Sequence, residues 1–212
     1  MIKLLGRASS SNVQKVAWAL AEMDVACERV DIGGSFGGNK EADYLKLNPN
    51  GAVPTLIDGD TVVWESNTIL RYLSNRFNRA VMYPSSDDAA GRSQVECWMD
   101  WQLASLSPGI TSLFISIIRT PIEQRDPLAI ERHRQVTLTS LRVLDGALAQ
   151  QSDGGPFLLG EALTLADFAI GPHVHRWFAL PIERESLPAL ERWHREVIRR
   201  PAFVQHVMVG MT

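Results

Sequence analysis

Residues 48–66 read NPNGAVPTLIDGDTVVWES, and this stretch decides the fold. Two short apolar runs, at 53–57 and 61–64, flank Asp58-Gly59-Asp60, which is a strong tight-turn signal. The pattern predicts a β-hairpin. Pro54 stands at the start of the first strand, where a residue without a backbone N–H is tolerated. A trans bond before Pro54 is the base-rate expectation, but a cis bend would turn the backbone of Val53 outward to pair with a bound peptide.

The chain after the hairpin predicts a helix that begins near Ser66. Serine is a common N-cap residue, and apolar residues recur on one face of the segment that follows. A helix N-terminus also presents free N–H groups to an anion. Ser66 can therefore hold a ligand carboxylate while Glu65 accepts from a ligand ammonium, and the pair would bind the free amino-acid end of a peptide.

Upstream of the hairpin, strand and helix patterns alternate. Residues 2–5 predict a buried strand, the next segment predicts a helix, and residues 25–32 predict a second strand. A glycine-rich loop at 33–38 and a short helix near 41–47 lead into the hairpin. Right-handed crossovers would make the first two strands parallel, with the hairpin adding antiparallel strands.

Hydroxyl and amide groups crowd the loop before the first helix, which contains Ser9, Ser10, Ser11 and Asn12. The simplest interpretation is an N-cap. The free N–H groups and the dipole of the helix would also favour an anion at this point. The residues alone do not say which of the four would face it.

The character of the chain changes after the polar segment at 84–88. Helical patterns punctuated by proline follow, so we expect an α/β domain over residues 1–80 and an all-helical domain over 88–212. Residues 164–167, Thr-Leu-Ala-Asp, predict a capping box. An aromatic and apolar run on the first long helices of this second domain reads mainly as core.

Composition excludes several classes of function. The 212 residues carry 21 basic and 24 acidic side chains, a net charge of −3, which gives no reason to expect nucleic acid or an anionic membrane as a partner. The N-terminus does not resemble a signal peptide, and we expect no membrane-spanning stretch. The only two cysteines, Cys27 and Cys97, lie far apart, so a cytoplasmic protein without a disulfide is expected.

Three kinds of chemistry are also disfavoured. No Gly-x-Ser-x-Gly elbow supports a serine hydrolase, and all five histidines lie in the second half of the chain, away from the serine-rich loop. No cysteine or histidine cluster indicates a metal, so no metal site is expected. Serines stand where a dithiol enzyme of this architecture would carry Cys-x-x-Cys, so any reactive thiol must come from a ligand.

Taken together, the motifs resemble those of the cytosolic glutathione transferases, of bacterial type, over essentially the whole chain. The resemblance rests on the serine-rich loop, on Asn-Pro-x-Gly-x-Val-Pro at 48–54, on Glu-Ser at 65–66 and on Thr-Leu-Ala-Asp at 164–167. It implies an α/β thioredoxin-like N-terminal domain followed by an all-α C-terminal helical domain, assembled as a homodimer. It further implies that Pro54 is cis.

The resemblance also implies residue roles. Val53 would pair with the cysteinyl backbone of glutathione, Glu65 and Ser66 would hold its γ-glutamyl end, and Asn39 or Lys40 would hold its glycyl carboxylate. Ser10 falls where many members keep a catalytic hydroxyl and Asn12 where some keep an asparagine that faces the thiol, with Ser9 and Ser11 close enough to compete. The expected pocket for an electrophile includes Trp101, Leu106 and Phe114.

The function that this resemblance implies is a detoxifying glutathione S-transferase. It would convert the bound thiol to a thiolate and add it to a small apolar electrophile, with glutathione as co-substrate and no further cofactor. Two alternatives stay open on the same fold. One is a glutathione-dependent disulfide or peroxide reductase, and the other is a non-catalytic glutathione-binding protein.

Overall fold

The computed structural model describes residues 1–151 and 154–210, and its first part is an α/β domain built on one mixed sheet. The strands lie in the order β2-β1-β3-β4, with β1 parallel to β2 and antiparallel to β3, as the sequence predicts. The elements of this domain, in chain order, are β1 (Ile2–Leu5), α1 (Ser11–Glu22), β2 (Cys27–Val30), η1 (Gly34–Phe36), α2 (Ala42–Leu47), β3 (Thr55–Asp58), β4 (Thr61–Trp64) and α3 (Ser66–Arg76).

The predicted hairpin forms between β3 and β4. Asp58 pairs with Thr61, so Gly59 and Asp60 make a two-residue connection. Gly59 has a φ of +59°, a conformation that glycine adopts without steric cost. The turn chemistry of the sequence therefore fixes the register of this pair.

The N-cap residue of helix α3 lies one residue earlier in the chain than the serine expected in that role. Glu65, with a φ of +69°, is the N-cap residue, and Ser66 is the first residue of the helix itself. The expectation that Ser66 caps the helix is thus wrong. A non-glycine residue at positive φ is strained, so it persists only where the surrounding structure holds it there. Such residues gather at functional sites.

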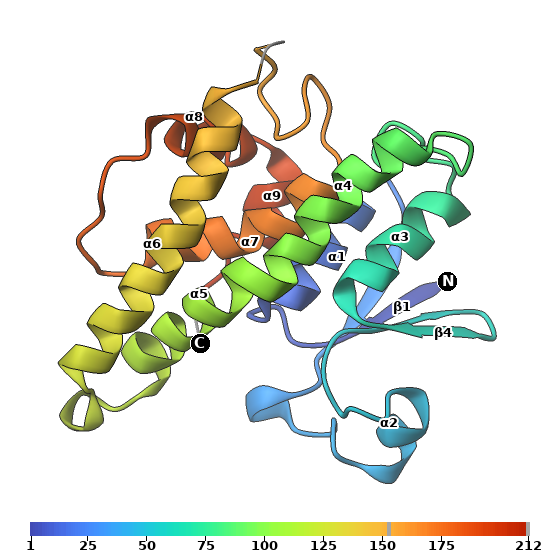
Figure 1. Cartoon of the computed structure of the whole chain (residues 1–212). Coiled ribbons are helices and arrows are strands. Elements are labelled where there is room, and N and C mark those ends of the chain that lie inside the picture. The colour runs from blue at the N-terminus through green and yellow to red at the C-terminus, as the bar shows by residue number, and fades with distance from the viewer. Residues whose placement is uncertain (152–153, 211–212) are drawn as a thin grey trace.

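Among the described residues of the second part, the regular elements are all helical apart from one isolated bridge between Phe157 and Gly160, which confirms the predicted fold class. In Figure 1 the sheet and α2 lie at the lower right, α6 lies at the left, and α1 and α7 lie between them. The elements are α4 (Ala89–Trp101), η2 (Gln102–Leu106), α5 (Ser107–Phe114), η3 (Ile115–Arg119), η4 (Ile122–Gln124), α6 (Pro127–Ala149), α7 (Leu165–Ala179), α8 (Pro188–Val197) and α9 (Pro201–His206). Segments η2 and η3 are single π-helical turns, whereas η1 and η4 are 3₁₀ turns.

One long helical run corrects an expectation from the sequence. Among the described residues, Ala89–Arg119 is long and apolar enough, by length and composition alone, to cross a membrane. The run combines α4, η2, α5 and η3, and it packs against α6 and α7. Core helices of helical domains meet the same criterion, and the buried face of this run includes Val95, Met99 and Ile110.

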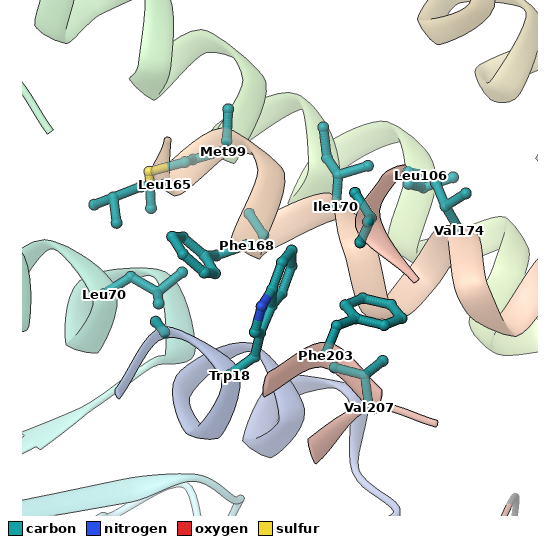
Figure 2. Close-up of a cluster of buried hydrophobic side chains, with 14 of the residues drawn as sticks. Trp18, Leu70, Met99, Leu106, Leu165, Phe168, Ile170, Val174, Phe203 and Val207 are labelled. Carbon is teal, nitrogen blue, oxygen red and sulfur yellow. The ribbon is translucent and has the colours of Figure 1, made fainter. Parts of the chain in front are cut away.

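The two domains share one hydrophobic core. Trp18 projects from α1 into the helical domain, where its ring meets Phe168 of α7 and Phe203 of α9 edge-on, with centroids 4.5 and 4.8 Å away (Figure 2). All three side chains are fully buried. Large aromatic contacts of this kind dominate packing energetics, so they hold α1, and the loop that precedes it, in a fixed place against α7.

The predicted capping box forms at the start of α7. The buried carboxylate of Asp167 accepts from the Thr164 N–H and hydroxyl, at 2.9 and 3.0 Å, and from the Leu158 N–H at 2.9 Å. The Trp193 indole N–H donates to the same carboxylate at 2.9 Å. Asp167 therefore joins the N-terminus of α7 to the preceding loop and to α8.

Candidate active site

A cavity of about 430 Å³ opens between the α/β domain and the helical domain. Two surface hollows of about 520 and 500 Å³ elsewhere on the described chain are lined by none of the predicted site residues. The residues that line this cavity and were predicted from the sequence are Ser9, Ser10, Ser11, Asn12, Asn39, Val53 and Phe114. The others are Arg7, Ala52, Leu103, Ser107, Thr111, Ile115, Arg119, His173 and Arg176.

The N-terminus of α1 forms one wall of this cavity. Ser10 is the N-cap residue, but its side chain makes no capping hydrogen bond, and no acidic residue occupies the first turn. The hydroxyl and the positive end of the helix dipole are therefore both available to an anion in the cavity. Asn12, in the same turn, accepts from the Ser66 hydroxyl at 3.3 Å, which links this wall to α3.

The loop from Asn48 to Val53 forms the second wall. The hydroxyl of Tyr44 and the side-chain amide of Asn48 both donate to the Ala52 carbonyl, at 2.6 and 2.9 Å. The Asn48 carboxamide oxygen also accepts from the Asn50 N–H, so this asparagine organises the turn. The Val53–Pro54 peptide bond is cis. Val53 lines the cavity and Pro54 is buried beside it.

Asn39 and Lys40 lie against this same loop. The Asn39 amide donates to the Gly51 carbonyl at 2.7 Å, and the Lys40 ammonium donates to the Asn50 carbonyl at 3.1 Å. A Cβ at Gly51 would lie 2.7 Å from both the Asn39 carbonyl oxygen and the Lys40 Nζ, so only glycine fits there. Asn39 lines the cavity, whereas Lys40 is exposed beyond the described lining.

Lys15 is a site residue that the sequence did not reveal. Its side chain is fully buried, and its ammonium donates to Ser66 Oγ at 3.4 Å, to Asn67 Oδ1 at 3.3 Å and to Gln102 Oε1 at 2.6 Å. Burial lowers the pKa of Lys15 to about 7, and the nearby charge of Glu65 opposes the shift. A cation thus lies directly behind Glu65 and Ser66.

The polar contacts continue from Lys15 into the helical domain. Gln102, in the π-helical turn η2, donates to the Ser107 hydroxyl, which is 3.0 Å from Nε2 of His173 on α7. Burial lowers the pKa of His173 well below its ordinary value, with Lys15 and Arg176 adding to the effect. His173 is therefore neutral at physiological pH, and it presents an imidazole to the cavity. A π-helical turn beside such a network is a common feature of functional sites.

Three arginines line the cavity, Arg119 and Arg176 on its helical side and Arg7 on its α/β side. Arg119 and Arg176 both lie over the ring of Phe114, with Cζ 5.1 and 4.1 Å from its centroid. Arg7 follows β1 and lies against Gly33 and Gly34. Scattered arginines carry no periodic signal, so this cluster could not be predicted from the sequence.

Two of the three residues expected to bind an electrophile do not line the cavity. Leu106, in the π-helical turn η2, is fully buried in the hydrophobic core. Trp101 packs edge-on against Trp98, with centroids 5.1 Å apart, and is absent from the lining. Phe114 is the member that reaches the cavity. An expectation based on apolarity alone could not separate core positions from lining positions.

The cavity provides hydrogen-bond donors and cations, but no nucleophilic sulfur. No cysteine is among its lining residues, and Cys27 and Cys97 are both free thiols elsewhere. Within the described ranges, no group of three or more histidine, cysteine, aspartate or glutamate side chains is placed to hold a metal ion. The hydrogen-bond donors and arginines that line the cavity suit an anionic ligand.

The mixed-sheet domain, the helical domain that follows it and the cavity between them have the architecture that the resemblance implies. Family models agree: the glutathione S-transferase N-terminal domain matches residues 1–75, and the glutathione S-transferase C-terminal domain matches residues 127–196. Glutathione S-transferase GstB of Escherichia coli K12 is 35% identical over 214 residues, covering 100% of both chains. This chain belongs to the glutathione S-transferase family.

Two further relatives bear on function. The theta class glutathione S-transferase of Xanthomonas axonopodis pv. citri, solved with glutathione bound, superposes with a TM-score of 0.92 at 38% identity, covering 100% of this chain and 99% of that one. The disulfide-bond oxidoreductase YfcG of Escherichia coli K12 is 29% identical over 195 residues, covering 89% of this chain and 85% of its own.

Proposed function

We propose that this protein is a glutathione S-transferase that binds glutathione along the α/β wall of the cavity and activates its thiol. The observation that carries the proposal is the N-terminus of α1, where the Ser10 hydroxyl is free of capping and the first turn holds no acid. The family relationship and the glutathione-bound relative support the same ligand.

Each part of glutathione has a matching group in the proposed complex. The γ-glutamyl ammonium would meet Glu65, and its carboxylate would meet Ser66 at the start of α3, with the Lys15 ammonium 3.4 Å behind the serine hydroxyl. The cysteinyl backbone would pair with Val53 as an added strand. The glycyl carboxylate would lie near Asn39 and Lys40, whose side chains now bond the 50–51 loop.

Activation requires that the bound thiol lose its proton. A free thiol titrates near about 8.5, and only the thiolate attacks well. A hydroxyl that donates to sulfur, together with the end of a helix dipole, favours the charged form. Each unit of pKa depression needs about 1.4 kcal/mol, which one or two charge-assisted hydrogen bonds supply. Ser10 would be the donor and Asn12 its neighbour, with the sulfur forming a bond to carbon as the leaving group departs.

A glutathione-dependent disulfide reductase is the second candidate. The relationship to the disulfide-bond oxidoreductase YfcG favours it, as does the absence of any cysteine from the cavity lining. In that reaction the glutathione thiolate attacks a disulfide, and one thiolate leaves. The same Ser10 environment would serve both reactions, because both begin from a thiolate.

A paired assay separates the two candidates. The purified protein and glutathione are given either an activated aryl chloride or hydroxyethyl disulfide under the same conditions. Conjugation well above the uncatalysed rate, with a weaker acceleration for the disulfide, supports the transferase. The reverse ratio would establish the reductase, and binding of glutathione without either acceleration would leave a glutathione-binding protein.

We expect Ser10→Ala to lower conjugation turnover on the order of tenfold, because the thiolate loses one donor. The pKa of the bound thiol should rise by about one unit, which moves the pH–rate profile toward alkaline pH. Affinity for glutathione should change little, since the γ-glutamyl and cysteinyl contacts stay intact. Ultraviolet absorbance of the bound thiolate gives the pKa directly.

Three comparison variants sharpen this test. Ser35→Ala changes an exposed serine outside the cavity and should have no effect. If Ser9→Ala or Ser11→Ala shifts the profile while Ser10→Ala does not, the donor is one of those neighbours. If none of the substitutions at Ser9, Ser10 and Ser11 shifts the profile, Asn12 and the backbone amides of α1 become the better explanation.

The assembly and location proposed for this chain follow from its family and its composition. We propose a cytoplasmic homodimer in which α3 of one subunit faces the helical domain of the other, since two-fold dimers are the commonest symmetric oligomers. Light scattering at micromolar concentration should give twice the chain mass of 23.6 kDa. A monomeric mass at that concentration would contradict this assembly.

A further inference from the structure

Among the described residues that line the cavity, arginines are present and acidic side chains are absent. Arg7, Arg119 and Arg176 all line the cavity, and no aspartate or glutamate is among its described lining residues. The rest of the lining on the helical side is neutral, from Leu103, Thr111 and Phe114 to His173. The space is therefore electrostatically suited to an anion.

Arg176 is the clearest indication of what the space binds. It projects from α7 with only 8% of its surface exposed, and its guanidinium makes no hydrogen bond or ion pair with any described residue. Its described contact is the face of Phe114, 4.1 Å away. Buried charges are ordinarily paired, because an isolated buried charge costs several kcal/mol. A buried arginine that faces a cavity without a protein partner indicates a partner that arrives from solution.

Arg7 and Arg119 add to the same field. Burial, with the charges of Arg119 and Arg7 added to it, lowers the pKa of Arg176 to about 10. Burial and the charge of Arg119 also lower the pKa of Arg7. Room for Arg7 is left by Gly34, since a Cβ there would lie 2.9 Å from Arg7 Cδ. Like charges that line one cavity repel one another, and a bound anion would relieve that repulsion.

We propose that Arg176 and Arg119 bind a carboxylate carried by the electrophile, so that the acceptor is an anionic aromatic compound rather than a purely apolar one. This inference rests on the proposed transferase function. The groups assigned to glutathione, from Ser10 to Ser66, all belong to the α/β domain, whereas Arg119, Arg176 and Phe114 belong to the helical domain. The ring of Phe114 provides an apolar surface for the aryl group beside the two cations.

The reaction itself leaves the carboxylate unchanged. Binding releases the thiol proton of glutathione to solvent, and the thiolate sulfur attacks the ring carbon that carries chloride. The carbon–sulfur bond forms, and chloride departs with the electron pair of the carbon–chlorine bond. The carboxylate serves only to position the ring, so its contribution is separable from the chemistry.

The test compares chlorodinitrobenzoate with its neutral amide, which has the same shape. Each kcat/KM is divided by the uncatalysed rate of that acceptor with glutathione, because the two rings differ in intrinsic reactivity. We expect the normalised value to favour the acid by about tenfold or more in the wild type. Arg176→Met should reduce the value for the acid at least about tenfold more than the value for the amide. Added salt should reduce the preference for the acid.

Two variants accompany Arg176→Met. Arg119→Met removes an exposed cation of the cluster and should shift the acid-to-amide ratio in the same direction, even if loss of the buried Arg176 impairs folding. Arg132→Met removes an exposed arginine on α6 outside the cavity and should leave the ratio at its wild-type value. Calorimetry with the two ready-made glutathione conjugates makes the same comparison without turnover.

The outcomes distinguish this inference from the proposed function. If the wild type accelerates both acceptors equally and binds both conjugates equally, the anion site is wrong while the transferase stands. If neither acceptor is accelerated and neither glutathione nor a conjugate binds, the proposed function fails and the anion site fails with it. An acid preference that Arg176→Met and Arg119→Met leave intact also overturns the assignment to these arginines.

Discussion

Lys15 shows how one buried side chain ties the site to the stability of the fold. Its ammonium has three acceptors, on Ser66, Asn67 and Gln102, so both domains contribute to holding it. Burial disfavours the charged form of Lys15 and lowers its pKa from 10.5 to about 7. The charge behind the expected γ-glutamyl site is therefore adjustable by pH in the physiological range.

The sign of the resulting pH dependence follows from this shift. Above about pH 7 the folded protein has released the Lys15 proton, whereas the unfolded chain keeps it until about pH 10.5. The unfolded state thus binds more protons in this window, and Lys15 contributes a stability that increases as pH rises through it. A full proton difference corresponds to about 1.4 kcal/mol per pH unit.

We expect Lys15→Met to remove this contribution. The variant should be less stable than the wild type, because three buried acceptors lose their donor. The gap in unfolding free energy should widen as pH rises from about 7 to about 9, by at most about 1.4 kcal/mol per unit. Urea unfolding of both proteins at each pH measures the gap, and groups common to both cancel. A gap independent of pH would show that Lys15 keeps its proton in the folded state.

The site residues that sequence analysis predicted are those whose position depends on local structure. Ser10, Asn12 and Val53 lie at the ends of helices or strands, and turn or cap chemistry places them. Lys15 and Arg176 lie inside helices, where the destination of a side chain depends on which face another domain covers. A lysine in an amphipathic pattern reads as solvated, and nothing in the sequence distinguishes the buried Lys15 from an exposed one.

At the scale of the element, the start of α7 depends on a single carboxylate. Asp167 is fully buried and accepts from the N–H groups of Leu158, Thr164 and Trp193. Asp126 also caps a helix, α6, but it is exposed and accepts from one N–H, that of Leu128, at 2.9 Å. The two aspartates differ mainly in burial and in the number of donors they satisfy.

We expect Asp167→Ala to lower the free energy of unfolding by about 3 kcal/mol, because the Thr164 hydroxyl and the three N–H groups are left without this acceptor. Asp126→Ala should cost about 1 kcal/mol, the ordinary value of an exposed N-cap. Urea unfolding followed by far-ultraviolet circular dichroism measures both losses. Equal losses would mean that water or neighbouring groups replace the Asp167 carboxylate.

At the scale of the whole molecule, the sequence predicts the order of elements well and their contacts poorly. The hairpin at Asp58-Gly59-Asp60 and the parallel pairing of β1 with β2 follow from turn chemistry and from crossover handedness. The contact of α1 with α7 does not follow, because apolar periodicity says that a helix face is buried but not against which partner. Leu106 shows the same limit, since it joins the core and is not among the residues that line the cavity.

Gly171 makes that contact between domains testable. A Cβ at this position of α7 would lie 2.7 Å from Cζ3 of Trp18 and 3.3 Å from Cε2 of Phe203, and both belong to rigid rings. Gly146, on α6, has nothing within 4 Å of the same added atom. In a helix interior, alanine is ordinarily more favourable than glycine by about 1 kcal/mol. A comparison of the two glycines therefore separates the effect of core packing on stability from the effect of helix propensity.

We expect Gly171→Ala and Gly146→Ala to change stability in opposite directions. The first should lower the free energy of unfolding by about 1–2 kcal/mol, because overpacking against Trp18 exceeds the helix-propensity gain. The second should raise it by about 0.5–1 kcal/mol.

A double-mutant cycle with Trp18→Phe tests the cause, since the smaller ring leaves room for the methyl group. Gly171→Ala should then cost clearly less in that background. Denaturation midpoints from circular dichroism provide all four free energies. A cost that is the same with Trp18 and with Phe at position 18 would place the clash elsewhere and contradict the close packing of α1 on α7.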